Sequence, residues 1–399
     1  MVSRRLVSHI PHIGFVLEQA LGHVTHAENL QRVINMNQSV HAHWCPIPYD
    51  TEGLAAKVPI YNSNWTVRAG LRARRSIRAA NRDAPLDALF IHTQVPAVLA
   101  STWLRRIPSV VSIDATPLQY DLLGEFYNHQ PGNARVERAK WLANRRCFEL
   151  ASAVVAWSSW AKAGLVDGYE VPTEKVTVIP PGVWHEQWSR PAGEPADDEV
   201  IRILFVGADL DRKGGATLLK AFRNVRARGV DVTRGLPAVE LHLVTKTAVQ
   251  PEPGVFVHDG LAPNSAAITA LYHRCHIFCL PTRADMLPQV LCEAGAAGLP
   301  LVSTSVGAIG EIVRDNETGL LVPPDDVEAL TSSLVALVDQ PDLRRRLGAE
   351  AAIVVQTTYD AKKNADRLLD LLREVVVGGN GQRPDNQWPK STDARRSTT

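Results

Sequence analysis

Long apolar runs are missing from this sequence of 399 residues. No stretch approaches the roughly 18 consecutive apolar residues of a transmembrane helix. Polar residues and proline interrupt the first 23 residues before the apolar core of a signal peptide could form. The sequence therefore predicts a cytoplasmic protein, either free or bound peripherally at the inner face of the membrane.

An excess of one charge is also missing, because 43 Lys+Arg face 42 Asp+Glu and the formal net charge is +1. Nucleic-acid-binding domains are usually much more basic, so nucleic acid is not expected as a partner. The five cysteines are an odd number scattered over a large chain, which predicts reduced thiols and no disulfide framework. We expect Cys275 and Cys279 to pack in a core.

The apolar segments that are present alternate with longer, helix-like stretches, and the alternation starts again after the polar, proline-rich segment 189–199. This pattern is typical of parallel βα units. The predicted fold class is therefore α/β, with two Rossmann-like, doubly wound parallel sheets. The predicted strands are 88–93, 109–116, 153–159, 175–182, 200–208, 240–246, 254–260, 276–281 and 300–307.

Two acidic residues stand eight positions apart in the stretch DMLPQVLCE, at 285–293. Pro288 is expected as the first helical residue and Gly298 as the end of that helix, so Asp285 lies just before the helix and Glu293 within it. Paired carboxylates repel a phosphate but accept hydrogen bonds from hydroxyl groups, such as those of ribose or a sugar ring. The simpler alternative is a helix cap at Asp285 and a surface residue at Glu293.

A second motif follows the first strand of the second half, in the stretch FVGADLDRKGGATLLKAF at 205–222. Gly207 stands at the turn, and Arg212 and Lys213 directly precede two glycines and a helix. Two cations at a glycine-rich helix start suit a pyrophosphate, although the spacing is not that of a P-loop. Two further segments support the pattern: 305–313 has glycines before an acidic helix start, and 316–330 has a turn, a short strand and a helix from Asp325 or Asp326.

Taken in this order, the segments resemble the retaining glycosyltransferases of family 4, which have the GT-B fold of two facing Rossmann-like domains. The most specific part is 281–322, which is similar to the family's E-x7-E region and its downstream glycine-rich segment. The resemblance implies a nucleoside-diphosphate sugar as donor substrate, with no cofactor and no metal. It also implies a helix at 359–377 that crosses back onto the first domain.

The resemblance also implies roles for individual residues. Glu293 would hold the ribose, Arg212 and Lys213 the diphosphate, and Leu261 would lie at the base. Gly22 and Gly207 would let backbone approach the donor. The residues expected to hold the donor sugar are Asp285, Met286, Leu287, Pro288 and Gln289.

Four positions depart from the family pattern. Asp285 replaces a glutamate, Ala208 replaces a phosphate-binding arginine, and Leu21 replaces the first glycine of a pair. Asp114 stands where many members have a histidine near the reacting carbon. Asp114 is therefore our candidate for orienting the donor sugar or the acceptor, and the predicted catalytic set is Asp285, Asp114, Lys213 and Arg212.

Three features of the first half have more than one interpretation. His92 ends a strand and either lines the same site or is an ordinary structural histidine. The alternating His41, His43 and Cys45 could mimic a zinc site, but this alternation is also what one face of a strand gives, and no fourth ligand is evident. The arginine-rich helix 65–82, with Trp65, Leu71 and Ile77, is either a solvated helix face or a contact with an anionic membrane.

These predictions give a domain plan and a function. The plan is an acceptor-side domain at 1–183, a hinge at 184–199, a donor-binding domain at 200–358, the crossing helix at 359–377 and a disordered tail at 378–399. The function is sugar transfer with retention to a hydroxyl of a glycan or lipid-linked acceptor. The alternatives are a nucleotide-sugar 2-epimerase of related fold and a catalytically silent sugar-nucleotide or glycan-binding subunit.

Overall fold

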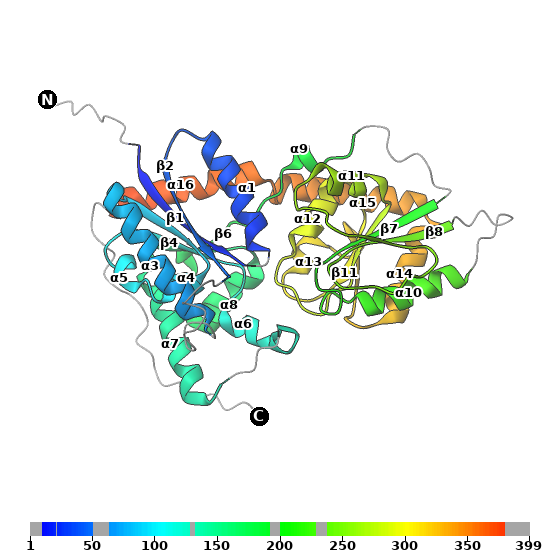
Figure 1. Ribbon diagram of the computed structural model, residues 1–399, viewed down its shortest axis with the longest axis horizontal. Coiled ribbons are helices and arrows are strands. Elements are labelled where there is room, and N and C mark those ends of the chain that lie inside the picture. The colour runs from blue at the N-terminus through cyan, green and yellow to red at the C-terminus, as the bar shows by residue number, and fades with distance from the viewer. Residues whose placement is uncertain are drawn as a thin grey trace.

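The structure is a computed structural model of the chain. Figure 1 shows two lobes side by side, each built around one sheet, with α16 lying along the first lobe. The residues that the structure describes are 10–20, 22–50, 64–127, 132–191, 200–228 and 238–379.

The sheet of the first lobe has six parallel strands in the spatial order β2-β1-β3-β4-β5-β6. In its central pairs, Leu17 lies opposite His92 and His92 opposite Ser112. All six carboxyl ends emerge at one edge, which is where α/β sheets place their ligands. The strands are β1 (His12–Gln19), β2 (His41–Pro48), β3 (Ala88–His92), β4 (Ser109–Ile113), β5 (Ala153–Ala156) and β6 (Val176–Val178).

The sheet of the second lobe is also six-stranded and parallel, in the order β12-β11-β10-β7-β8-β9. β10 and β7 are neighbours in the middle of the sheet, with Phe278 opposite Leu204. The strands are β7 (Val200–Val206), β8 (Ala238–Val244), β9 (Val255–His258), β10 (Ile277–Leu280), β11 (Leu301–Thr304) and β12 (Gly319–Val322).

Helices connect the strands of the first lobe, and several of them begin at side-chain caps. Asn64, Asn133 and Ser158 each accept a backbone N–H in the first turn that follows. The helices are α1 (His23–Met36), α3 (Trp65–Asp83), α4 (Gln94–Val98), α5 (Ser101–Leu104), α6 (Pro117–Leu122), α7 (Ala134–Leu150) and α8 (Ser159–Tyr169), with 3-10 turns η2 (Gly124–Tyr127) and η3 (Thr173–Lys175).

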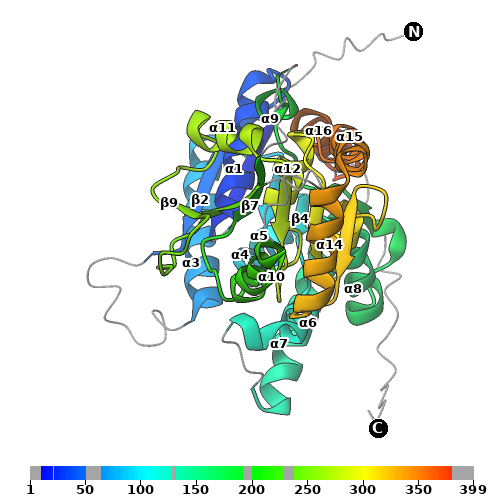
Figure 2. The same ribbon diagram turned by 90° about the vertical axis from the view of Figure 1, so that its right-hand side faces the viewer.

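The second lobe is wrapped in the same way, and Figure 2 shows α10 beside α14. Asp326 caps α14, in agreement with the helix start predicted near Asp325 or Asp326. The helices are α9 (His185–Trp188), α10 (Gly215–Ala227), α11 (Ala266–Arg274), α12 (Gln289–Ala296), α13 (Ile309–Ile312), α14 (Val327–Asp339) and α15 (Pro341–Thr358). The last helix, α16 (Ala361–Gly379), packs on the first lobe instead.

The predicted α/β fold class is confirmed, and the nine predicted strands are present as β3 to β11. β1 was not predicted, although it lies between β2 and β3 and six of its eight residues are buried. The sequence analysis had weighed this segment only as a possible leader. All five thiols are free and buried, including Cys275 and Cys279.

Alternate side chains of the first sheet pack on two separate cores, as the period of a strand requires. Val16 and Ile91 face α3, α4, α7 and α8. Phe15 and Phe90 face α1 and the apolar stripe of α16. The last described helix therefore completes the core of the first lobe.

The chain crosses between the lobes twice, and the two crossings pair with each other. Val183 N donates to Tyr359 O at 2.9 Å, and Ala361 N donates to Val183 O at 3.0 Å. A Cβ at Gly182 would lie 2.2 Å from Cα of Ala361, so the second crossing passes directly over a glycine.

Parts of the predicted domain plan lie outside the described residues: 192–199 of the hinge and 380–399 of the tail. Within the described part, α9 falls inside the predicted hinge, and α16 runs to Gly379, two residues into the predicted tail. In the described part of the chain, no helix is long and apolar enough to cross a membrane.

We expect Gly182→Ala to destabilise the protein by roughly 1–3 kcal/mol, because the added methyl must push the two crossings apart. The measurement is the free energy of unfolding by denaturant. Gly378→Ala is the matched control, since its Cβ would meet nothing within 4 Å in a helix. Equal stability of the two variants would contradict the tight crossing.

Candidate functional site

An ion pair joins the loops that follow β7 and β10. Lys213 Nζ contacts Asp285 Oδ2, and each side chain is only 13% exposed. The two loops meet because β7 and β10 are neighbouring strands whose carboxyl ends lie at the same edge. The structure thus brings together the two predicted motifs of the second lobe.

Arg212 lies where the two lobes touch. Its Nη1 donates to Ala284 O at 2.8 Å in its own lobe and to the Tyr127 hydroxyl of the first lobe at 3.3 Å. Its guanidinium also stands 4.8 Å from the centre of the Tyr127 ring. Asp209 lies 3.4 Å from Nε, so one carboxylate balances this cation.

Glycines allow the loops to approach so closely. Gly214 has φ +77°, and a Cβ there would lie 1.9 Å from Pro281 O. Gly307 has φ +56°, and its Cβ would lie 2.2 Å from Asp285 O. Gly207 sits under the stem of Lys213, where a Cβ would lie 3.0 Å from Cγ. Positive φ and contact with backbone both exclude other residues at 214 and 307.

Helix α12 begins at Gln289, one residue later than predicted, with Pro288 as its N-cap residue. No side chain among the described residues caps it. Gln289 Nε2 donates across the lobes to Gly22 O at 3.3 Å, and Gly22 is the N-cap residue of α1. Met286 and Leu287 have buried side chains.

Glu293 turns into the second lobe rather than to the surface. The side chain is buried, and the Tyr272 hydroxyl donates to Oε2 at 3.0 Å. Burial raises the pKa of Glu293 to about 7, against the lowering effect of this hydrogen bond. The sequence pattern predicted an ionised carboxylate, whereas burial shifts the pKa of Glu293 towards neutral pH, with no cation among the described residues to offset it.

Leu261 follows β9 at the edge of the second sheet and packs half-buried against the lobe's core. It lies two strands from β7, so the predicted base contact and the Lys213–Asp285 pair are at different places along the same edge.

Asp114 directly follows β4, at the carboxyl edge of the first sheet. Its Oδ2 is 3.3 Å from Nε2 of His23, the first residue of α1. Burial raises the pKa of Tyr127, and the charges of Asp285 and Asp114 raise it further. Both carboxylates therefore act on one tyrosine between the lobes. We use the name inter-lobe junction for Gly22, His23, Asp114, Tyr127, Arg212, Lys213, Asp285 and Gln289.

The sequence analysis missed four contributors to this region. Tyr127 and Phe126 carry no motif, yet they stack under Arg212 and under Arg283, which lies 4.8 Å from the Phe126 ring centre. His23 was passed over beside Gly22. Glu311 accepts from Ser159 N and Trp160 N at 2.9 and 2.8 Å across the lobes, and the acidic helix start at 305–313 was its only signal.

His92 is buried and stacked on Trp157, with ring centres 4.7 Å apart, and burial lowers its pKa well below the usual value. His41, His43 and Cys45 lie on β2, as the strand interpretation predicts. Among the residues described, no three His, Cys, Asp or Glu side chains are placed to hold a metal ion.

The arginine-rich helix α3 corrects part of the membrane hypothesis. Arg68 and Ile77 are buried, and Trp65 donates to Glu18 Oε1 at 2.7 Å, so these three side chains face the protein. They face inward because α3 must cover the sheet with its apolar stripe. The exposed residues of the helix are Leu71, Arg74, Arg75, Arg78, Arg82 and Asp83, and Asp83 pairs with Arg82 at the end of the helix.

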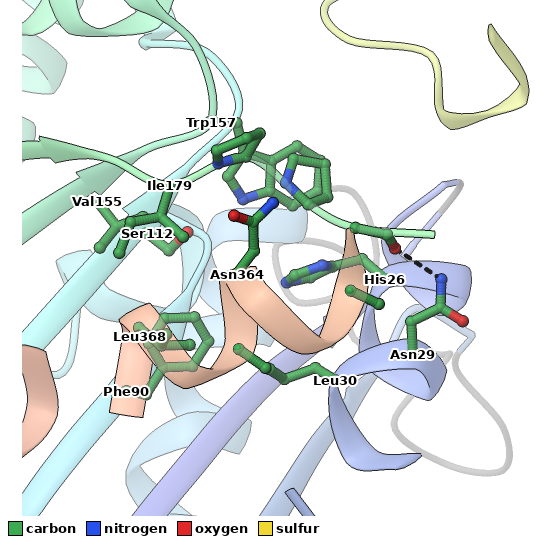
Figure 3. Close-up of a pocket in the computed structure, with 15 residues that line it drawn as sticks. His26, Asn29, Leu30, Phe90, Ser112, Val155, Trp157, Ile179, Asn364 and Leu368 are labelled. Atoms are coloured by element: carbon green, nitrogen blue, oxygen red, sulfur yellow. Dashed lines mark hydrogen bonds between the residues drawn. The ribbon is translucent and has the colours of Figure 1, made fainter. Parts of the chain in front are cut away.

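A cavity of about 30 Å³ lies between α1, the first sheet and α16, behind the His23 end of the junction, and is lined in part by His26 and Trp157. Figure 3 shows Asn29 donating to Gly182 O beside it, at 3.0 Å. This volume holds only one or two water molecules. It is too small for a nucleotide or a sugar.

Comparison with solved structures defines the class of fold. Sucrose-phosphate synthase from Thermosynechococcus elongatus superposes with a TM-score of 0.70 at 18% identity, covering 92% of this chain and all of the other. Anabaena HepE in complex with UDP-glucose gives a TM-score of 0.64 at 15% identity, covering 91% and 100%. The two facing parallel-sheet lobes therefore have the GT-B fold.

Family models give the family. Residues 27–187 match Glycosyltransferase Family 4, and residues 201–340 match Glycosyl transferases group 1. The chain belongs to glycosyltransferase family 4.

Two curated relatives show how far the likeness extends. Alpha-D-kanosaminyltransferase of Streptomyces kanamyceticus is 25% identical over 83% of this chain and 87% of its own length. The MMP alpha-(1->4)-mannosyltransferase of Mycolicibacterium hassiacum is 32% identical over 48% of this chain and 46% of its own length. The chain thus spans about half the length of the second relative.

Stability should depend on pH through Glu293. The folded-state pKa near 7 lies above the ordinary 4.5, so folding favours the protonated form. This contribution is full below the unfolded pKa and declines by up to about 3 kcal/mol as pH rises to about 7. We expect the wild type to lose this stability between pH 4.5 and 7.5 relative to Glu293→Gln, measured by urea unfolding. Identical pH profiles would contradict a buried carboxyl.

Proposed function

We propose that the chain transfers a sugar, with retention, from a nucleoside-diphosphate sugar to an acceptor hydroxyl. The observation that carries the proposal is the meeting of Lys213, Asp285 and Arg212 at the carboxyl edge of the second sheet, opposite Gly22 and Asp114. Such an edge is where α/β sheets bind ligands, and these groups have the charges that a diphosphate and a hydroxylated ring require.

In this proposal the second lobe holds the donor. Lys213 and Arg212 stabilise the diphosphate as it departs, which lowers the barrier electrostatically. When the diphosphate binds, it replaces Asp285 as the partner of Lys213. Asp285 is then able to accept hydrogen bonds from the sugar. Backbone at 286–289 lies beside this sugar, and Glu293, in the middle of α12, holds the ribose. Two carbonyls already use the amides of Gly214 and Gly215, so the cationic side chains carry most of the phosphate binding.

The acceptor belongs to the first lobe in this proposal. The printed names of the relatives include a kanosaminyltransferase and a mannosyltransferase, which transfer different sugars. We therefore propose the shared chemistry only: a hydroxyl of a glycan or a lipid-linked saccharide. The acceptor attacks from the side of the leaving group, and the departing phosphate takes the proton. Closure about the paired crossings at Val183 and Asp360 excludes water.

We expect one member of a panel of UDP-, GDP-, ADP- and dTDP-sugars to raise the melting temperature. A ligand at 100 times its Kd adds about 2.7 kcal/mol. UDP-glucose is the first candidate, because HepE binds it in a similar fold. The measurement is thermal denaturation with and without each donor.

Lys213→Gln and Arg212→Gln should abolish most of that shift, since each removes a cation from the diphosphate. Lys220→Gln is the control, because it removes a cation from the outer face of α10. If no donor raises the melting temperature, the transferase proposal is refuted and the alternative of a catalytically silent binding subunit is favoured.

We also propose that the exposed face of α3 contacts an anionic membrane, which would fit a lipid-linked acceptor. Leu71 is 44% exposed, and Arg74, Arg75 and Arg78 are exposed beside it with no acidic residue among them. Each cation near such a surface is worth about 1 kcal/mol. Within this proposal the protein acts at the inner face of the membrane.

Replacing Arg74, Arg75 and Arg78 together by Gln should weaken sedimentation with anionic liposomes by roughly 100-fold at low salt, equivalent to about 3 kcal/mol. Liposomes of neutral phosphatidylcholine should bind neither form. The control with equal loss of charge is Arg223, Arg314 and Arg345 to Gln, on the second lobe. Equal sedimentation of both triple variants would refute the contact.

A further inference from the structure

A polar cluster is buried at the carboxyl edge of the first sheet, on the acceptor side of the inter-lobe junction. It contains three imidazoles, from His23, His26 and His92, and the carboxylates of Glu18 and Asp114. His23 and His26 come from the first turns of α1, and the other three residues end or follow strands β1, β3 and β4. Nothing in the roles proposed above uses His23 or Glu18.

His23 lies between the two carboxylates. Its Nε2 is 3.3 Å from Asp114 Oδ2, and its Nδ1 is 3.8 Å from Glu18 Oε2. Glu18 is itself fixed, because Trp65 Nε1 donates to Oε1 at 2.7 Å and Thr93 Oγ1 donates to Oε2 at 2.5 Å. The first lobe therefore holds a row of carboxylate, imidazole and carboxylate, in which His23 Nδ1 faces Glu18 at ion-pair distance without a hydrogen bond.

The geometry favours a single charged imidazole in this cluster. Burial alone would lower the pKa of His23, but Asp114 and Glu18 together raise it. Burial and the neighbouring His23 lower the pKa of His26 to about 3 and that of His92 well below its usual value. Asp114 has a lowered pKa despite its burial, because His23 bonds to it. The raised pKa of His23 and the lowered pKa of Asp114 each favour the charged form of that side chain.

The Asp114 end of the row reaches the junction. The side chains of His23 and Asp114 are 17% and 21% exposed, whereas that of Glu18 is 6% exposed. Ala115 N donates to Asp114 Oδ1 at 2.9 Å, and His23 holds Oδ2, so both oxygens have a fixed direction. Each carboxylate oxygen has a further lone pair, which can accept a hydrogen bond from a bound hydroxyl.

We propose that His23 is a positioning residue of the transfer reaction: lying between Glu18 and Asp114, it holds Asp114 in the orientation that accepts a hydrogen bond from the acceptor hydroxyl. The proposal rests on the transferase function and names the residues that serve its acceptor side. Asp114 remains ionised throughout and takes no proton, so no bond is made or broken at either residue. The cations and the carboxylate of the donor site come from the other lobe, which leaves Asp114 to the acceptor.

The first test needs no substrate. The imidazole C–H resonance of His23 is followed by NMR from pH 5 to pH 9 in the wild type, Asp114→Asn and Glu18→Gln. We expect the pKa of His23 to lie above the ordinary 6.5 in the wild type and to fall in both variants. A His23 that titrates at or below 6.5 in the wild type would overturn the proposal, whatever the protein binds.

The second test uses water as the acceptor probe, with the donor identified by thermal shift. His23→Ala should slow the release of nucleoside diphosphate about 100-fold, since a misplaced reacting group costs a factor of this size. The Kd for the donor should stay within about twofold of the wild type. His23→Gln keeps a hydrogen-bond donor without the charge and should recover part of the rate.

The pH profile separates positioning from a structural role. The wild-type rate should fall as pH rises through the raised pKa of His23, and this alkaline decline should be absent in His23→Gln. His41→Gln, at the opposite end of the sheet, is the control and should keep the wild-type profile. An unchanged rate and profile in His23→Gln would overturn the proposal. Failure of every donor to bind would instead refute the transferase function. The NMR titration would still test whether Glu18 and Asp114 raise the pKa of His23.

Discussion

The rest of the junction depends on the ion pair between Lys213 and Asp285. Each residue follows a strand in the middle of the second sheet, and each is mostly buried, so neither charge could lie there alone at low cost. Pairing makes both tolerable and fixes the two loops against each other. The glycines at 214 and 307 are a consequence, because only residues without a Cβ permit loops this close.

The two lobes place their charges in different ways. In the second lobe, cations lie beside a carboxylate at the sheet edge, and Glu293 stays apart with Tyr272 as its partner. In the first lobe, an imidazole lies between two carboxylates. Arg212 and Tyr127 connect the two arrangements through a hydrogen bond and a stacked guanidinium. Separate electrostatic settings on each side suit a reaction in which one partner loses a diphosphate and the other offers a hydroxyl.

Much of the fold could be predicted from the sequence, because apolar runs bounded by turns determine strands in a parallel sheet. The family resemblance assigned Asp285 and Lys213 to one donor site, but their direct pairing depends on β7 and β10 being neighbours in the sheet, although two strands separate them in the chain. The orientation of Glu293 could not be predicted, because spacing on a short helix does not say which face is buried. β1 was missed since the polar and proline-containing residues before it concealed an otherwise apolar strand.

Contacts between the lobes could not be predicted from the sequence either, because they depend on how distant segments pack together. Tyr127 and Glu311 have no local motif, and their partners lie in the other lobe. The charged helix α3 was ambiguous until packing separated Arg68 and Trp65 from the exposed arginines. The surroundings of His23 could not be predicted for the same reason. Asp114 is distant in sequence and Glu18 lies on another element, so only the folded sheet edge brings them to His23.

Because α16 packs back on the first lobe, the order in which the ribosome makes the chain affects how that lobe folds. The face of the first sheet that carries Phe15 and Phe90 is covered partly by Leu368, Leu369 and Leu372, which are translated after the whole second lobe. A nascent chain must therefore expose this apolar surface while the second lobe is made. The amino-terminal lobe is the first to be synthesised and the last to be completed, and until then it is the part of the chain with most need of a chaperone.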